Sequence, residues 1–227
     1  MPIPFINNGK RPYDQPTISN SHLFYLPPNT PYGNLTLKVS KILQRLDLIN
    51  IKITVLNEWH ERNLIELTSS DFISYNPIND HSLSDEITFW LKRTTDELIS
   101  LLYIKDFYIA NEEFPDILKV DCIGALINEP SQLARNIKSK YSGHISFLEI
   151  LNDIANAHKH SFVNSDMNVT SLSEPQVFAL TLPRNSLKNQ PQFLHVHVRE
   201  IIEKFNIFYG ETTSELRQWP NVFEVGK

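Results

Sequence analysis

The chain has 227 residues, of which 41% are hydrophobic, and its 26 acidic and 21 basic side chains give a formal net charge of −5. This composition is typical of a folded globular protein, and the net acidity excludes a protein that coats nucleic acid by charge alone. The single cysteine, Cys122, excludes an internal disulfide framework and a cysteine-based zinc site. No apolar run reaches the roughly 18 residues of a membrane span, and we expect a cytoplasmic protein without a membrane partner.

The first 34 residues hold seven of the 14 prolines. Proline lacks a backbone N–H and restricts the residue before it, so regular helix is not expected there. Apolar residues such as Phe5 and Phe24 distinguish this stretch from a plain polar tail. We expect residues 1–34 to form an irregular N-terminal arm that lies along the following domain or along a partner.

A long helix is predicted at about 35–67. Apolar residues there alternate at spacings of four and three: Leu35, Val39, Ile42, Leu46, Ile49, Ile53 and Leu56. The alternative is a pair of strands at 35–39 and 51–56, since isoleucine, valine and threonine are frequent there, but the sustained spacing favours the helix. Such a helix is on the order of 50 Å long, enough to project and pair with a second copy, so we expect self-association or another protein partner.

The sequence of the remaining residues predicts five further helices and one β-hairpin. Ser84 is the expected N-cap of a helix at about 85–110, after a loop at 68–83. The remaining elements are helices at about 115–127, 131–141 and 144–163, strands at 177–182 and 193–198, and a last helix that ends near residue 217. The fold class is therefore mainly α: a helical bundle with a long first helix and a β-hairpin (about 176–198) inserted before the last helix, in one domain over 35–227.

One face of the predicted central helix carries a line of polar side chains. Glu149, Asp153, Asn156 and His160 follow at spacings of four, three and four, which places them on a shared face, and Lys159 projects beside them. In the functional interpretation, His160 is an acid or base near neutral pH that Asp153 or Asn156 orients. The alternative is a solvated helix face whose terminal cations complement the helix dipole.

Charged residues also interrupt the predicted helix at 85–110. Arg93 and Glu97 are spaced four apart and are expected to pair on the helix surface. If that face is buried, its charges have to be paired, and they could meet the polar line of the central helix. Arg93 therefore joins His160, Asn156 and Lys159 as a candidate catalytic residue.

Two histidines on the second predicted strand are candidate metal ligands. His195 and His197 are spaced two apart, which puts both side chains on one face of a strand, where they could bind zinc or another transition metal. The alternative is a half-exposed strand face with ordinary polar alternation. We expect no other cofactor.

A basic concentration lies before the central helix, in the run from Arg135 to Lys140 that includes Lys138. Together with His144 it could bind RNA or another anionic partner. The alternative is a solvated surface. Arg135 and Lys138, with Asp153 and Glu149, are the candidate binding residues.

The run Asn156-Ala157-His158-Lys159-His160 (N-x-x-K-H) resembles one found near a helix end in many uncharacterised bacterial helical proteins. The order of predicted elements over about 35–218 also resembles HEPN-type domains, which are helical bundles of toxins, CRISPR effectors and phage-defence systems. HEPN ribonucleases carry an arginine, four to six residues and then a histidine. Here the residue before His144 and before His195 at such a distance is a lysine, Lys138 or Lys188, which lacks the planar fork of arginine.

The sequence is compatible with three functions. The first is a non-enzymatic α-helical binding protein, in a bacterial stress or phage-defence system, whose N-terminal arm and long first helix supply the interface. The second, which the resemblance implies, is a metal-independent ribonuclease that uses His160 with Asn156, Lys159 and Arg93. The third is a metal-binding protein that uses His195 and His197.

Overall fold

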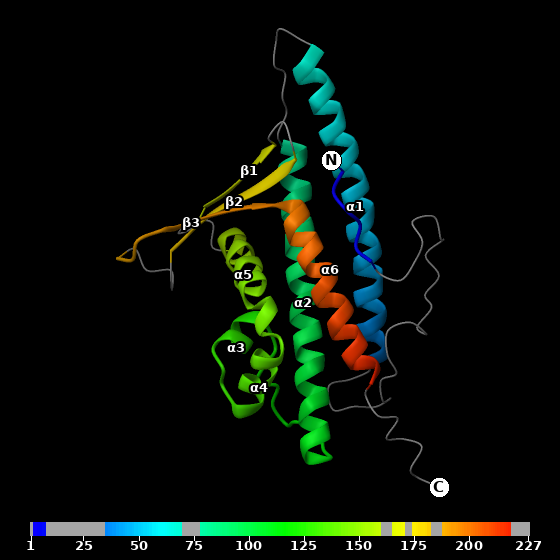
Figure 1. The fold of residues 1–227 in the computed structure, drawn as a ribbon, viewed down its shortest axis with the longest axis vertical. Helices are drawn as coiled ribbons and strands as arrows, with labels where there is room; N and C mark the ends of the chain where they lie inside the picture. Colours follow the sequence, from blue (N-terminus) through cyan, green and yellow to red (C-terminus); the bar gives the residue numbers. More distant parts are fainter. Residues whose placement is uncertain are drawn as a thin grey trace. The chain divides into compact units, whose positions relative to one another are not determined.

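The computed structural model describes residues 2–7, 35–69, 78–159, 165–170, 174–182 and 188–218. Its elements, in chain order, are α1 (Leu35–Ser69), α2 (Ile78–Asn111), α3 (Ile123–Ile127), α4 (Gln132–Lys140), the 3-10 helix η2 (Ser142–His144), α5 (Ile145–Lys159), β1 (Ser165–Thr170), β2 (Pro175–Thr181), β3 (Gln192–His197) and α6 (Val198–Arg217) (Figure 1). The predicted fold class is confirmed: the chain is mainly helical, with a long first helix and a hairpin before the last helix. Within the described ranges, no helix is both long and apolar enough to cross a membrane.

The chain divides into two compact units. Unit 1 comprises Met1–Ile6, Leu48–Lys92 and Ser146–Phe205. Unit 2 comprises Asn7–Asp47, Arg93–Ile145 and Asn206–Lys227. Both units draw on α1, α2 and α6, and the three-stranded sheet belongs to unit 1.

The first helix follows from its apolar spacing. Val39, Ile42 and Leu46 in unit 2, and Ile49, Ile53 and Leu56 in unit 1, are all at most 3% exposed. The spacing of four and three therefore lies on the buried side of α1, as expected of an amphipathic helix. The prediction of one helix is confirmed, and the alternative of two strands is wrong.

The second helix begins before its predicted start. Ser84 is not an N-cap: it lies inside α2, is 1% exposed, and its carbonyl accepts a 2.8 Å hydrogen bond from Thr88 Oγ1. The start at Ile78 follows Pro77 directly in the sequence. A proline beside the first turn is a helix-start signal, so the sequence contains two such signals, Pro77 and Ser84.

The segment after α2 is less helical than predicted. Only Ile123–Ile127 forms α3, and residues 112–122 are irregular. The sulfur of Cys122 caps α3 by accepting from the Ala125 N–H at 3.4 Å. The next helix agrees with its prediction, since Ser131 is the N-cap of α4 and accepts from the Ala134 N–H at 3.2 Å.

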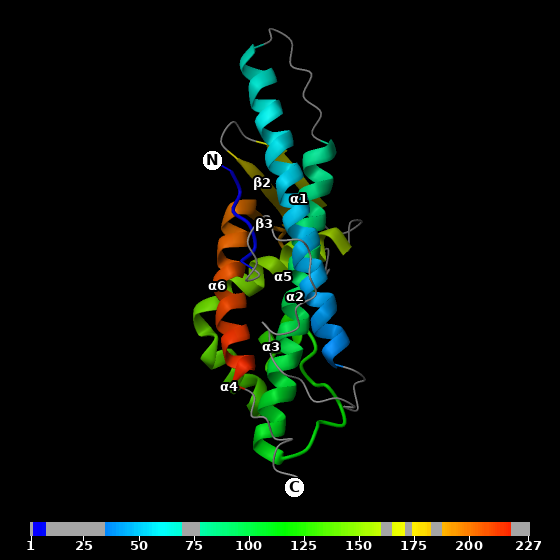
Figure 2. The same cartoon turned by 90° about the vertical axis from the view of Figure 1, so that its right-hand side faces the viewer.

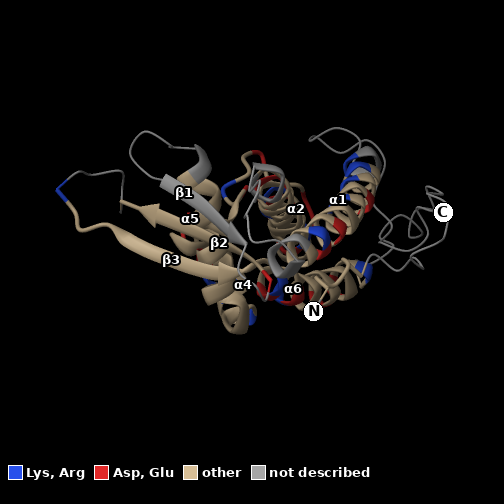
Figure 3. Cartoon of the chain, turned by 90° about the horizontal axis from the view of Figure 1, so that it is seen from above, with Lys and Arg blue, Asp and Glu red and all other residues tan. Residues whose placement is uncertain are grey.

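The predicted hairpin is present as β2 and β3, which pair antiparallel with Phe178 opposite His195. A third strand, β1, pairs with the other edge of β2, giving the order β1-β2-β3. Sequence patterns did not predict β1, because Ser165 and Asp166 are common turn residues. Neither β2 nor β3 contains a charged residue, and both are tan along their length in Figure 3.

The last helix follows the sheet without a loop. β3 ends at His197 and α6 begins at Val198. Val198, Ile201, Ile202 and Phe205 are at most 2% exposed and belong to the core of unit 1. The amphipathic spacing predicted for this helix is therefore present, and it fixes which face of α6 turns away from solvent.

Candidate functional site

Residues 2–7 are neither helix nor strand, yet residues 2–6 are held closely in unit 1. Figures 1 and 2 show this segment, in blue, running alongside α1 and next to the first turns of α6. Ile3 and Ile6 are each 2% exposed, whereas Phe5 between them is 43% exposed. Segment 2–7 thus buries two aliphatic side chains three residues apart.

Two asparagines of α1 hold the backbone of this segment. Asn57 Oδ1 accepts from the Ile3 N–H at 2.7 Å, and Asn57 Nδ2 donates to the Ile3 carbonyl at 3.0 Å. Asn50 makes the same pair of contacts with Ile6, at 2.7 and 3.1 Å. Each side-chain amide therefore satisfies both polar groups of one residue, as a neighbouring strand would. We call Asn50 and Asn57 the asparagine clamps.

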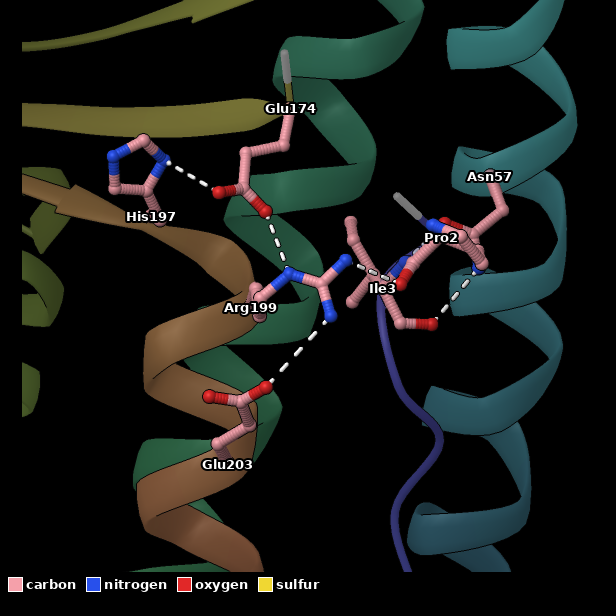
Figure 4. Close-up of polar contacts among 7 residues, drawn as sticks. All are labelled: Pro2, Ile3, Asn57, Glu174, His197, Arg199 and Glu203. Atoms are coloured by element: carbon pink, nitrogen blue, oxygen red, sulfur yellow. Dashed lines mark hydrogen bonds and ion pairs between the residues drawn. The ribbon is translucent and has the colours of Figure 1, made fainter.

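Arg199, in the first turn of α6, reaches the start of the same segment (Figure 4). Its Nη2 donates to the Pro2 carbonyl at 2.5 Å, and its Nε donates to Glu174 Oε2 at 2.7 Å. Glu203 Oε1 lies 3.7 Å from Nη1. The guanidinium is thus fixed by a carboxylate on one side while it binds backbone on the other.

The same carboxylate connects Arg199 to one predicted metal ligand. Glu174 Oε1 lies 3.3 Å from Nδ1 of His197, a buried nitrogen that makes no hydrogen bond of good geometry (Figure 4). The ring of His195 lies 5.5 Å from that of His197, so the pair shares a strand face. His195 Nε2 is 2.8 Å from Gln176 Oε1, and its ring stacks on Phe178 at 4.6 Å. Among the described residues, no group of three or more histidine, cysteine or acidic side chains suits a metal ion, and the metal site stays a prediction.

The polar line of α5 is only partly described. Glu149 is exposed, and Asp153 and Asn156 are half-buried. Burial raises the pKa of Asp153, and the neighbouring Glu149 carboxylate raises it further. Lys159 is the last residue of α5, and His160 lies outside the described residues. The catalytic grouping around His160 therefore stays a prediction.

The other candidate residues, in unit 2, make local contacts. Arg93 is 60% exposed and lies 3.7 Å from Glu97, in the predicted pair, while Glu97 also accepts from both Nη atoms of Arg45 at 2.7 and 3.1 Å. Arg135 donates to Gln132 of its own helix at 2.8 and 3.2 Å.

Lys138 is likewise held near its own helix. It donates to Glu129 Oε1 at 2.6 Å and to the Ile127 carbonyl at 3.1 Å. The two candidate binding residues of α4 thus already contact neighbouring protein groups.

A buried charge cluster in unit 2 was missed by sequence reasoning. Glu215 is 8% exposed and accepts from Lys105 Nζ at 2.6 Å and from the Tyr141 hydroxyl at 2.7 Å, and Lys140 Nζ lies 2.5 Å away. Burial raises the pKa of Glu215, but the hydrogen bonds from Lys105, Lys140 and Tyr141 outweigh it, so the pKa lies below the ordinary 4.5. One signal was visible: Lys105 interrupts an apolar run, and a buried charge needs a partner.

A hollow of about 500 Å³ adjoins this cluster. It is lined by Lys140, Tyr141, Gly210, Glu211, Ser214, Glu215 and Gln218. His144 Nε2 lies 2.8 Å from Glu211 Oε2 at its edge. Every polar atom of the Glu215 carboxylate already has a protein partner, so the cluster serves first to hold its three helices together.

The asparagine clamps are thus a pair of side chains that bind both polar groups of the backbone at two positions of one segment. Compared with protein-family models, with curated proteins and with solved structures, the chain matches none.

Proposed function

We propose that this protein acts by binding an extended segment of another polypeptide along the face of α1 that carries Asn50 and Asn57. The observation that carries the proposal is the pair of two-sided backbone contacts made by the asparagine clamps. Main-chain hydrogen bonds of this kind give affinity to any extended segment, and burial of particular side chains gives selectivity.

The spacing of the clamps supports this function. Asn50 and Asn57 are seven residues apart, which is about 10.5 Å along a helix. The residues they hold, Ile3 and Ile6, are three apart, and three residues of an extended polyproline II chain, which returns to the same face every three residues, span about 9 Å. The helix therefore presents its amides at the repeat of an extended chain, so both clamps can engage one ligand without distorting it.

The alternative functions rest on other residues. A ribonuclease needs His160, and cleavage of RNA by the wild type and by His160→Ala, both with EDTA present, tests that role. A metal protein needs His195 and His197, and elemental analysis of the purified protein tests it. In the described part of the chain, no specific contact favours either function over polypeptide binding.

The test of the proposed function is peptide selection. A display library of random peptides is panned against the full chain carrying Ile3→Asp and Ile6→Asp, which removes the two buried side chains of segment 2–7. The matched control adds Asn50→Ala and Asn57→Ala. Selected peptides should bind the first protein and lose at least about tenfold in affinity for the second, because four hydrogen bonds are gone.

Circular dichroism establishes that both proteins are folded. If no peptide is recovered, or if the recovered peptides bind both proteins equally well, the clamps are not a ligand site and the proposed function is wrong.

A further inference from the structure

We infer that segment 2–7 is a built-in competitor for this site, and that the external ligand is an extended segment of a different polypeptide with aliphatic residues at two positions three apart. The inference rests on the proposed function and names the ligand class and its regulation. The backbone of segment 2–7 makes the hydrogen bonds to Asn57 and Asn50 that an external ligand would make, so the two cannot bind at the same time.

The contacts of segment 2–7 define what the site accepts. Its two clamped residues, Ile3 and Ile6, are buried, while Phe5 between them is 43% exposed. Asn57 and Asn50 each accept from a backbone N–H, which proline lacks, so proline is excluded at these two positions.

Proline is permitted, and favourable, at positions 2 and 4 of the segment. Pro2 offers its carbonyl to Arg199, and the N–H that Pro4 lacks is not needed by either clamp. A proline also holds the residue before it in an extended conformation, so Pro4 preorganises Ile3 for its clamp and lowers the entropic cost of binding. The ligand is therefore aliphatic-x-x-aliphatic, with proline favoured directly after the first aliphatic residue.

The tether decides between a second copy and a different polypeptide. Residues 8–34, which are 27 residues, connect the segment to α1. Because segment 2–7 belongs to the same chain as the clamps, its binding is intramolecular, so an identical segment from a second copy competes poorly at ordinary concentrations. The displacing ligand has to make contacts beyond those of segment 2–7, which a different polypeptide can do.

The experiment measures binding of a labelled peptide with the sequence of residues 2–7, PIPFIN, by fluorescence anisotropy. The full chain with Ile3→Asp and Ile6→Asp should bind it at least about tenfold more tightly than the wild type, whose site is already filled. Addition of Asn50→Ala and Asn57→Ala should abolish this binding. Phe5→Asp is the matched control, because it places the same charge in the same segment at an exposed position and should behave like the wild type.

A second measurement uses the unaltered chain. Excess selected peptide should accelerate hydrogen exchange at the Ile3 and Ile6 amides, because displacement exposes them to water. Unchanged exchange on saturation with the peptide would overturn the inference, as would equal affinity of the wild type and the Ile3→Asp, Ile6→Asp protein for PIPFIN.

The failures can be told apart. If selected peptides depend on Asn50 and Asn57 but bind the wild type as tightly as the substituted protein, the proposed function holds and the competitor role is wrong. If PIPFIN shows no binding that depends on the clamps, segment 2–7 is no ligand mimic. A concentration-dependent dimer of the wild type that Ile3→Asp abolishes would make a second copy the occupant, against the inference.

Discussion

The ammonium of Lys105 on α2 lies 2.6 Å from the carboxylate of Glu215 on α6, and the two side chains are 7% and 9% exposed. Lys140 and Tyr141 complete the surroundings of this carboxylate, so a single acid connects three separate stretches of unit 2. A charge that is buried with several hydrogen bonds is costly to disturb, because its buried partners lose compensation for leaving water.

We expect Glu215→Ala to lower the free energy of unfolding by roughly 3 kcal/mol, as expected when one partner of a buried ion pair is removed. Asp106 lies 3.1 Å from Lys105 and still pairs with this ammonium after the substitution. The expected loss of stability is therefore near the lower end of the range for a broken buried ion pair. Urea unfolding at pH 7 measures it. Glu211→Ala, one turn earlier and 57% exposed, is the control and should cost less than about 1 kcal/mol. Equal losses of stability for Glu215→Ala and Glu211→Ala would contradict the stabilising role of the buried Glu215 carboxylate.

Glu215 should also contribute to the pH dependence of stability. Because its pKa is lower in the folded chain than the ordinary 4.5, its stabilisation is present above about pH 4.5 and is lost as the pH falls through the folded value. We therefore expect Glu215→Gln to differ most from the wild type at pH 7 and to converge with it on acidification. Urea unfolding from pH 7 to pH 3 follows the difference; a constant gap across this range would show that Glu215 does not titrate as stated.

Asp153 should behave in the opposite sense. Its pKa is raised above the ordinary 3.8 by burial and by Glu149, so the unfolded chain ionises first and stability falls as the pH rises from about 3.8 to the folded value. Asp153→Asn is expected to increase the free energy of unfolding at pH 7 and to have no such effect below about pH 3.8. Glu149→Gln, at an exposed position, serves as the comparison and should give a smaller gain of the same sign. A loss on Asp153→Asn at pH 7 would mean that the carboxylate has a stabilising partner.

Ile3 and Ile6 should show coupled losses. A fully buried isoleucine costs roughly 2–5 kcal/mol on replacement by alanine, but a segment that can detach limits the loss to its own docking free energy. We expect Ile3→Ala with Ile6→Ala to cost less than the sum of the single substitutions, as measured by a double-mutant cycle in urea. Ile49→Ala, in the interior of α1, has no such limit and should show the full loss. Strict additivity of Ile3→Ala and Ile6→Ala would indicate that the segment does not detach as one piece.

The fold was largely predictable because its main signals are local. The spacing of four and three in α1 and α6, and the alternation in β2 and β3, each depend on one stretch of sequence. The predicted elements are wrong or missing where a contact with a residue far away in the sequence determines the local structure. Asp96 Oδ1 accepts from the Ile123 N–H at 2.9 Å and so helps to set the start of α3, a contact across 27 residues that no local pattern contains. β1 likewise exists because β2 offers it a paired edge.

The candidate site was less predictable for the same reason. The spacing of Asn50 and Asn57 is visible in the sequence, but asparagine pairs on a helix are common and acquire meaning only once segment 2–7 lies beside them. The predicted site residues, such as His160 and His195, belong to residue types whose chemistry is recognisable from sequence alone. The asparagine clamps act through backbone geometry, which composition and spacing do not reveal.

The direct passage from His197 in β3 to Val198 in α6 has a mechanical consequence. No residue separates the two elements, so a displacement of the hairpin passes through one peptide bond to the first turn of α6, which carries Arg199. A molecule that tilts the hairpin would therefore also swing the guanidinium away from the Pro2 carbonyl, and so loosen the first residue of segment 2–7 from a distance.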